Sequence, residues 1–302
     1  MTDLSTHPSQ VASAWLADFN AAMESQDIDA AAALFGADAY WRDLVTFTWN
    51  ICTQESPAEI RAMLQARLAD VKPGHFALEG TPTEAGGVID AWFTFETAVG
   101  RGRGHLRLQN GKAWTLLTTM TELKGFEEKK GAHRIKGAEH GVHPGRKTWA
   151  ELRDEEQRTL GFSEQPYVLI VGGGQGGIAL GARLRRLGVP AIIIERNEKP
   201  GDSWRKRYKS LCLHDPVWYD HLPYLPFPDD WPVFAPKDKI GDWLEMYTKV
   251  MELNYWGSTT CRKASFDEAT QTWNVVVERG GKELTHKPKQ LVLALGVSSY
   301  QN

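Results

Sequence analysis

The stretch VLIVGGGQGG, residues 168–177, decides the fold of the second half of this chain. Its four apolar residues predict a strand buried on both faces, because a strand with one wet face would alternate apolar and polar residues. The glycines predict a tight turn, and the residues after them predict a helix over 176–187 that Gly188 ends. A second apolar run, AIIIE at 191–195, predicts the next buried strand. Together they form one βαβ unit of a Rossmann-type α/β fold.

The glycine turn has the pattern of a dinucleotide-binding motif. Gly172, Gly174 and Gly177 satisfy G-x-G-x-x-G, and Glu195 ends the next strand 18 positions after Gly177. The first glycine permits the turn, the second lets backbone approach a diphosphate, and the third lets helix pack on strand. The helix N-terminus offers N–H groups to phosphates, and Glu195 can accept hydrogen bonds from ribose hydroxyls. A glycine turn without a ligand is the alternative, which the strand–turn–helix context disfavours.

Composition limits the class of protein. The 302 residues include 35 Lys+Arg and 38 Asp+Glu, with 42% hydrophobic residues, which is typical of a globular chain with two domains. A formal charge of −3 gives no reason to expect nucleic acid as a partner. There is no apolar run of about 20 residues for a membrane span and no secretory signal. Three scattered cysteines favour a cytoplasmic setting.

The first 125 residues have a different pattern. A helical period over 11–35 and a capped helix beginning at Ser56-Pro57 accompany strand-like runs at 39–49, 76–79, 88–99, 104–108 and 113–123. Asn110-Gly111 predicts a hairpin turn between the last two runs. We therefore expect an α+β domain with a curling antiparallel sheet over residues 8–125. Residues 126–164 are expected to be a solvated linker with a helix near 149–160, and residues 165–302 the α/β domain.

Three motifs after the βαβ unit carry a resemblance. They are GDSWRKRY at 201–208, SLCLH at 210–214 and LPYLPFP at 222–228. In this order and spacing they resemble the flavin-containing monooxygenases, in the bacterial and fungal branch similar to plant YUCCA-type enzymes. The resemblance implies a first Rossmann fold for FAD, a second for NADPH, and a flavin hydroperoxide as the oxidant. Asp202, where many relatives carry a second glycine, and Leu295, in place of a threonine, depart from the pattern.

The resemblance also assigns site residues. Ser203 and Trp204 would approach the flavin end, and Arg196 would flank the adenine. His214 falls where animal relatives place an asparagine beside the flavin ring, so it is the catalytic candidate, with a structural loop histidine as the alternative. The residues expected to hold the cofactor are Gly172, Gly174, Gln175, Gly176, Gly177, Glu195, Arg196, Ser203, Trp204 and Gly296.

The N-terminal domain resembles the nuclear-transport-factor and polyketide-cyclase-like (SnoaL-like) cone fold. In catalytic cousins an acid inside the cone acts as a general base, a role that Asp43 could fill. A domain kept for dimerisation or docking is favoured instead, because a fold does not imply a function. His133, His140 and His143 lie in the linker and predict no metal site, since nothing makes them converge.

We expect a monooxygenase in which NADPH reduces FAD, oxygen reoxidises the flavin, and a small organic substrate is oxygenated. After Gly177 the sequence has no second G-x-G-x-x-G, so the chain looks truncated before the NADPH domain. The alternatives are a catalytically inactive FAD-binding or dimerisation module and an NAD-dependent dehydrogenase. A homodimer through the N-terminal domain is also expected. The segment from Gly201 to Pro228 argues against the dehydrogenase.

Overall fold

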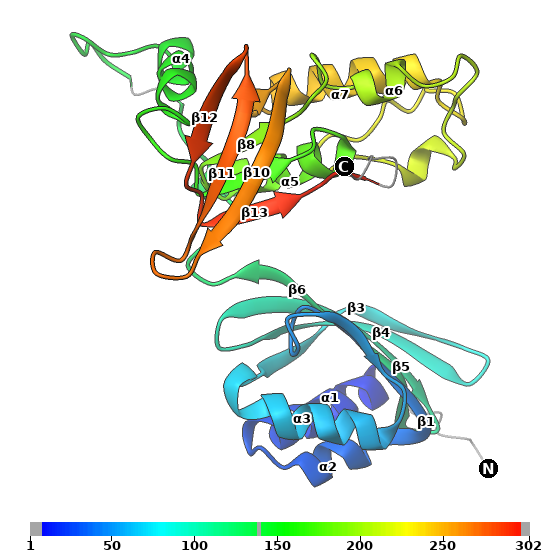
Figure 1. The fold of residues 1–302 in the computed structure, drawn as a ribbon. Coiled ribbons are helices and arrows are strands. Elements are labelled where there is room, and N and C mark those ends of the chain that lie inside the picture. The colour runs from blue at the N-terminus through cyan, green and yellow to red at the C-terminus, as the bar shows by residue number, and fades with distance from the viewer. Residues whose placement is uncertain (1–7, 138–139, 297–302) are drawn as a thin grey trace, which may run out of the picture. The chain divides into compact units, whose positions relative to one another are not determined.

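A computed structural model describes residues 8–137 and 140–296 of the chain. It divides into two compact units, Met1–Glu128 and Lys129–Asn302 (Figure 1). Within the described residues, no helix combines the length and the apolar character that crossing a membrane requires.

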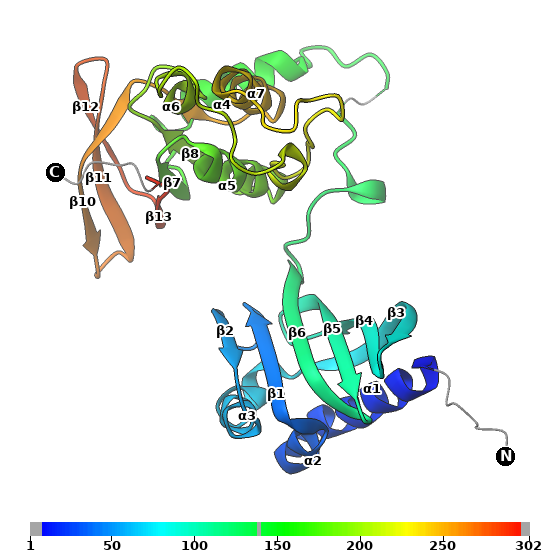
Figure 2. The same cartoon turned by 90° about the vertical axis from the view of Figure 1, so that its right-hand side faces the viewer.

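The first unit has three helices on one side of a curved sheet (Figure 2). The helix α3 begins as the sequence predicts, since the Ser56 hydroxyl accepts a hydrogen bond from the Glu59 amide at 3.3 Å. The Glu59 carboxylate accepts from the amide of Glu55, at 2.8 Å, so the reciprocal bond of the expected capping box falls one residue earlier. The bounds are α1 Pro8–Glu24, α2 Ile28–Ala33 and α3 Pro57–Val71.

The sheet of the first unit is mixed. Its six strands lie in the order β2-β1-β6-β5-β4-β3. All neighbouring pairs are antiparallel except β1 and β6, which run parallel, so the expected all-antiparallel sheet is wrong at that pair. Hairpin signals set the direction of sequence neighbours only, whereas β1 and β6 meet across most of the unit. The bounds are β1 Phe35–Leu44, β2 Ile51–Gln54, β3 Gly74–Ala85, β4 Val88–Glu96, β5 Gly100–Gln109 and β6 Lys112–Leu123.

Two turns fix the hairpins of this sheet. Asn110 and Gly111 have φ of 51° and 73°, as the predicted turn between β5 and β6 requires. Gly86 and Gly87 form the same kind of turn between β3 and β4, with φ of 59° and 77°. The helices and the inward residues of the strands enclose one apolar core built around Phe19, Trp41 and Phe93.

The second unit is built on a parallel sheet in the order β13-β7-β8-β9. Alternate residues of β7 enter different cores: Val168 and Ile170 pack beneath helices α5 and α7, while Leu169 and Val171 pack toward a small antiparallel sheet. The prediction of strands buried on both faces is therefore confirmed. The bounds are β7 Val168–Val171, α5 Gln175–Arg186, β8 Ala191–Ile194, α6 Asp202–Arg205, α7 Lys237–Val250, β9 Tyr255–Trp256 and β13 Gln290–Leu293.

The small sheet contains a hairpin around Gly280-Gly281, which have φ of 58° and 73°. Its strands are β11, Thr272–Arg279, and β12, Lys282–His286, preceded by β10, Thr259–Asp267, which the sequence did not reveal. The helix α4, Trp149–Thr159, lies where a helix was expected and is tied to the rest of its unit. Glu156 of α4 pairs with Arg185 at 2.5 Å, and the Trp149 indole donates to Glu252 at 2.5 Å.

Candidate dinucleotide-binding site

The glycine turn between β7 and α5 is closely packed at two points. Gly172 has a φ of +113°, and a Cβ there would lie 2.4 Å from the carbonyl oxygen of Ala294, just after β13. A Cβ on Gly177 would lie 2.0 Å from the carbonyl oxygen of Gly172. Both positions therefore require glycine for packing, as expected for the first and third glycines of the motif.

The middle of the turn is open. A Cβ on Gly174 or Gly176 would meet nothing within 4 Å. Gly174 caps α5 without a side-chain hydrogen bond, and within the described residues the amides of Gln175, Gly176 and Gly177 have no acceptor outside the helix. Free N–H groups at the positive end of a helix suit an anion such as a diphosphate. The glycines thus leave room for a ligand at the point where the donors converge.

The carboxylate of Glu195 folds back onto this turn. Its Oε2 accepts a hydrogen bond from the amide of Gly173 at 2.8 Å. Its Oε1 accepts two more, from the amide and the side-chain Nδ2 of Asn197, at 2.9 and 2.7 Å. A carboxylate has about four acceptor positions, so one remains for a ribose hydroxyl. The sequence pointed to Glu195, but it gave no signal for Asn197.

Tyr255 of β9 binds the carbonyl group of the same residue, Gly173. Its hydroxyl donates to the carbonyl oxygen of Gly173 at 3.2 Å. Burial raises the pKa of Tyr255, and the charges of Glu195 and Asp202 raise it further, so the hydroxyl keeps its proton and remains a donor. Gly173 is consequently fixed through both its N–H and its C=O group.

One side-chain hydrogen bond links the short helix α6 to the first turn of α5. The Trp204 indole donates to Oε1 of Gln175 at 3.1 Å, which brings two of the expected site residues together. Arg205 bonds to the carboxylates of Asp202, Asp242 and Glu245 at 3.1, 2.8 and 2.7 Å, so it joins α6 to α7. Asp202 departs from the family pattern. Its carboxylate accepts a hydrogen bond from the amide of Lys199 at 3.2 Å and thereby stabilises the turn before α6.

Other expected site residues are more remote from the turn. Arg196, Ser203 and His214 have exposed side chains, and none of them bonds to the glycine turn within the part of the chain described. Gly296 follows β13 with a φ of +70°. The structure therefore gathers the glycines, Gln175, Glu195 and Trp204 around one point, and leaves His214 without a partner that would explain a catalytic role.

Asp43 in the first unit is fully buried, and its carboxylate is occupied. Oδ2 accepts from the amides of Phe47 and Thr48, at 3.0 and 2.9 Å, and from the Thr48 hydroxyl at 2.8 Å. Oδ1 accepts from Thr118, whose oxygen in turn accepts from the Trp41 indole at 2.9 Å. These bonds stabilise the turn after β1, so the geometry supports a structural role for Asp43.

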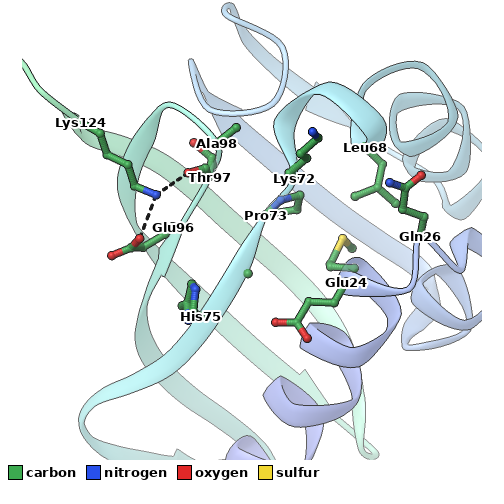
Figure 3. Close-up of a pocket in the computed structure, with 12 residues that line it drawn as sticks. Glu24, Gln26, Leu68, Lys72, Pro73, His75, Glu96, Thr97, Ala98 and Lys124 are labelled. Carbon is green, nitrogen blue, oxygen red and sulfur yellow. Dashed lines mark hydrogen bonds and ion pairs between the residues drawn. The ribbon is translucent and has the colours of Figure 1, made fainter.

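The first unit also has a hollow that the sequence did not indicate (Figure 3). It has a volume of about 350 Å³ and lies among the ends of α1 and α3 and the neighbouring ends of β3 and β4. Lys124 bonds to the Glu96 carboxylate at 2.9 Å and to the Thr97 carbonyl oxygen at 2.7 Å at one side of it (Figure 3). The Lys124 hydrogen bond holds the pKa of Glu96 below its usual range. Lys124 and Glu96 neutralise each other at this side of the hollow, which the charged side chains of Glu24 and Lys72 also line (Figure 3).

Comparisons with known proteins point to one group of enzymes. The chain is 35% identical over 141 residues to a probable indole-3-pyruvate monooxygenase, YUCCA9, of Arabidopsis thaliana, which covers 45% of this chain and 34% of that protein. It is 36% identical over 132 residues to the indole-3-pyruvate monooxygenase YUCCA1 of Oryza sativa subsp. japonica, covering 43% and 32%. The chain thus spans about a third of the length of these relatives.

Solved structures and family models complete the comparison. A flavin-containing monooxygenase from Stenotrophomonas maltophilia is 24% identical and has a TM-score of 0.39, covering 43% of this chain and 38% of that one. No protein-family model matches the sequence. Over a little under half of its length, the chain is similar to flavin monooxygenases of the YUCCA group.

Proposed function

We propose that the second unit binds FAD and is the FAD-binding part of a flavin-dependent monooxygenase. The observation that carries the proposal is the hydrogen bond from the Gly173 amide to the Glu195 carboxylate, at 2.8 Å. It lies beside the amides at the start of α5, which have no acceptor among the described residues. This arrangement combines a diphosphate site with an acceptor for the ribose. The similarity to YUCCA enzymes favours FAD over NAD as the dinucleotide.

The residues of this chain would hold and orient the cofactor. Gly174 and Gly176 leave space for the diphosphate, the first amides of α5 bind its oxygens, and Glu195 accepts from the adenosine ribose. When bound, FAD supplies the redox chemistry, with NADPH as reductant and oxygen and a small organic molecule as co-substrates. Trp204, fixed through Gln175, would lie on the flavin side of the turn, as the resemblance implies.

The test of FAD binding is direct. Purified protein is stripped of any bound flavin, titrated with FAD and followed by flavin fluorescence and calorimetry. We expect one FAD per chain, competed by ADP, because ADP carries the diphosphate and ribose. The matched variants are Glu195→Gln, expected to weaken FAD about tenfold through loss of a charged acceptor, and Glu198→Gln, an exposed acid nearby that should have no effect. Absence of FAD and ADP binding by the unaltered protein would refute the proposal.

Whether this chain oxidises NADPH is a separate question. The competing function is an FAD-binding or dimerisation module without catalysis. Anaerobic titration of the FAD-loaded protein with NADPH distinguishes them, since stoichiometric bleaching of the flavin is expected only from a chain with a reductant site. Bleaching followed by oxygen-dependent recolouring supports the monooxygenase, and a flavin that stays oxidised supports the module.

For the first unit we propose a SnoaL-like domain that forms a homodimer through its sheet. Tyr40, Ile51 and Trp92 are 43%, 60% and 40% exposed, and strand alternation places them opposite the buried core residues. Apolar side chains on an open sheet face favour association with a second copy. Light scattering during gel filtration tests this: Trp92→Lys should shift a dimer to a monomer.

The three cysteines are free thiols, which supports a reducing, cytoplasmic setting.

A further inference from the structure

We infer that Asn197, assisted by Lys206, is a positioning residue that keeps Glu195 aimed at the ribose of the bound dinucleotide. The inference deepens the proposed function and rests on it. It also predicts that a displacement of Glu195, at the ribose end of the site, is accompanied by a displacement of Trp204 at the other end. The basis is a closed ring of hydrogen bonds and short chain segments that starts and ends at the glycine turn.

The ring can be followed from residue to residue. The Gly173 amide donates to Glu195, and Glu195 accepts from the Asn197 side chain at 2.7 Å. The Asn197 Oδ1 accepts from the ammonium group of Lys206 at 2.9 Å.

Lys206 directly follows α6, the helix that carries Trp204. The Trp204 indole donates to Gln175 at 3.1 Å, and Gln175 lies two residues after Gly173 in the chain, which closes the ring. The ring therefore includes the turn that is proposed to hold the diphosphate.

Asn197 is itself held firmly. Its carbonyl oxygen accepts the amide of Ser258 at 2.8 Å, just after β9. The backbone of Glu195 is fixed on both sides, by a bond from its amide to the Trp256 carbonyl oxygen at 2.9 Å and by the Thr259 amide at 2.8 Å. With both backbones fixed, the remaining freedom of Glu195 is rotation of its side chain. Asn197 restricts that rotation directly, because its backbone amide and its Nδ2 both hold Oε1 while the Gly173 amide holds Oε2. The Nδ2 bond is the shorter of the two bonds to Oε1 and is the one that a substitution of Asn197 removes.

The side-chain chemistry of Asn197 suits this position. An amide can donate to a carboxylate through its nitrogen and accept from an ammonium group through its oxygen at the same time. An aspartate there would retain the bond to Lys206 but place an oxygen against Glu195 Oε1, where two carboxylates repel each other. Lys206 is 61% exposed, so its own contribution is screened by solvent and smaller than that of Asn197.

The experiment measures by calorimetry the affinities of the protein for ADP, for 2′-deoxy-ADP and for FAD, the full ligand. The ratio of the affinity for ADP to that for 2′-deoxy-ADP reports on the contact with the 2′-hydroxyl. The unaltered protein should bind ADP about tenfold more tightly than 2′-deoxy-ADP, because only ADP offers the 2′-hydroxyl to Glu195. In Asn197→Ala this ratio should fall to about two, and FAD affinity should fall about tenfold. Asn197→Asp should lower the affinity for FAD further, whereas Lys206→Ala should lower it only about twofold. Lys209→Ala, an exposed neighbour, and Asn274→Ala, in β11, are the controls and should match the unaltered protein.

The ratio separates positioning from a general structural role. A variant that merely loosens the fold lowers the affinities for ADP and 2′-deoxy-ADP equally, so the ratio of the two affinities stays at its original value. That result for Asn197→Ala would overturn the inference. A ratio near one in the unaltered protein would overturn it as well, while FAD binding keeps the proposed function intact. Failure of the unaltered protein to bind any of the three ligands refutes the proposed function, and the inference with it. In ligand-free protein, Asn197→Ala should also speed hydrogen exchange at the Gly173 amide, whereas both controls should not.

Discussion

His286 should make the second unit sensitive to acid. This residue ends β12 and has no exposed surface, and among residues 8–137 and 140–296 neither of its ring nitrogens has a hydrogen-bond partner. The ring packs edge-on against Trp256, with centroids 5.4 Å apart, and the Arg279 guanidinium lies 4.3 Å from the same indole. A second positive charge in this apolar layer would have no counter-ion among the described residues that contact it.

The sign of the effect follows from burial, which lowers the pKa of His286 below its usual value of 6.5. Below that pH the unfolded chain takes up a proton that the folded chain resists. Stability is therefore full above about pH 6.5 and decreases as the pH falls. The loss is at most about 1.4 kcal/mol for each pH unit, the value for one proton. His286→Phe should abolish this dependence, and at pH 7 it should add about 1 kcal/mol by removing two unpartnered polar atoms.

The assay is hydrogen exchange of peptides from β10 to β12 between pH 5 and pH 8, corrected for the intrinsic exchange rate at each pH. It reports on this unit alone, which matters because a chain of two units need not unfold in one step. His286→Leu serves as a second variant in case phenylalanine overfills the site, and His133→Phe, at an exposed position, is the control. Equal pH dependence in the unaltered protein and in both His286 variants would show that the reasoning is wrong.

Three further predictions follow from individual contacts. Gly174→Ala should fold normally, because its Cβ meets nothing within 4 Å, but should bind FAD at least tenfold more weakly in the titration above. Gly177→Ala should lower the melting temperature of the second unit even without ligand, because its Cβ would lie 2.0 Å from a backbone oxygen; unchanged melting would contradict this. Asp43→Asn should destabilise the first unit by about 3 kcal/mol in urea unfolding, because the amide nitrogen would face either the donors at Oδ2 or the Thr118 hydroxyl that donates to Oδ1. Asp38→Asn, at an exposed position, is the control.

The sequence predicted those parts of the site whose roles are local. Gly172 and Gly177 are required by contacts within one strand–turn–helix unit, and Glu195 follows from the length of the next strand. Asn197 and Tyr255 were missed because their roles depend on where distant segments meet. Tyr255 lies 82 residues from the peptide it bonds to, on a strand of two residues that no periodicity could reveal.

The aromatic residues of the proline-rich segment show the same limit. Phe227 is buried and stacks on Trp231, with centroids 4.7 Å apart. Trp218, Tyr219 and Phe234 are instead 55%, 76% and 52% exposed. Composition places all of these residues in one loop, but only the path of the loop decides which rings face the core.

The run GRGRG at 100–104 shows why composition can mislead about a strand. Glycine disfavours strands, and the sequence predicted β5 only from Gly104 onward, yet the strand begins at Gly100. A Cβ on Gly102 would lie 2.3 Å from the ring of Phe95, and one on Gly104 would lie 2.1 Å from the ring of Phe93. Both rings come from β4, so they occupy the space that side chains of β5 would otherwise fill. The glycines are therefore part of the core packing, because a large residue on one strand requires a small one opposite it, and this complementarity becomes visible only when the two strands are paired.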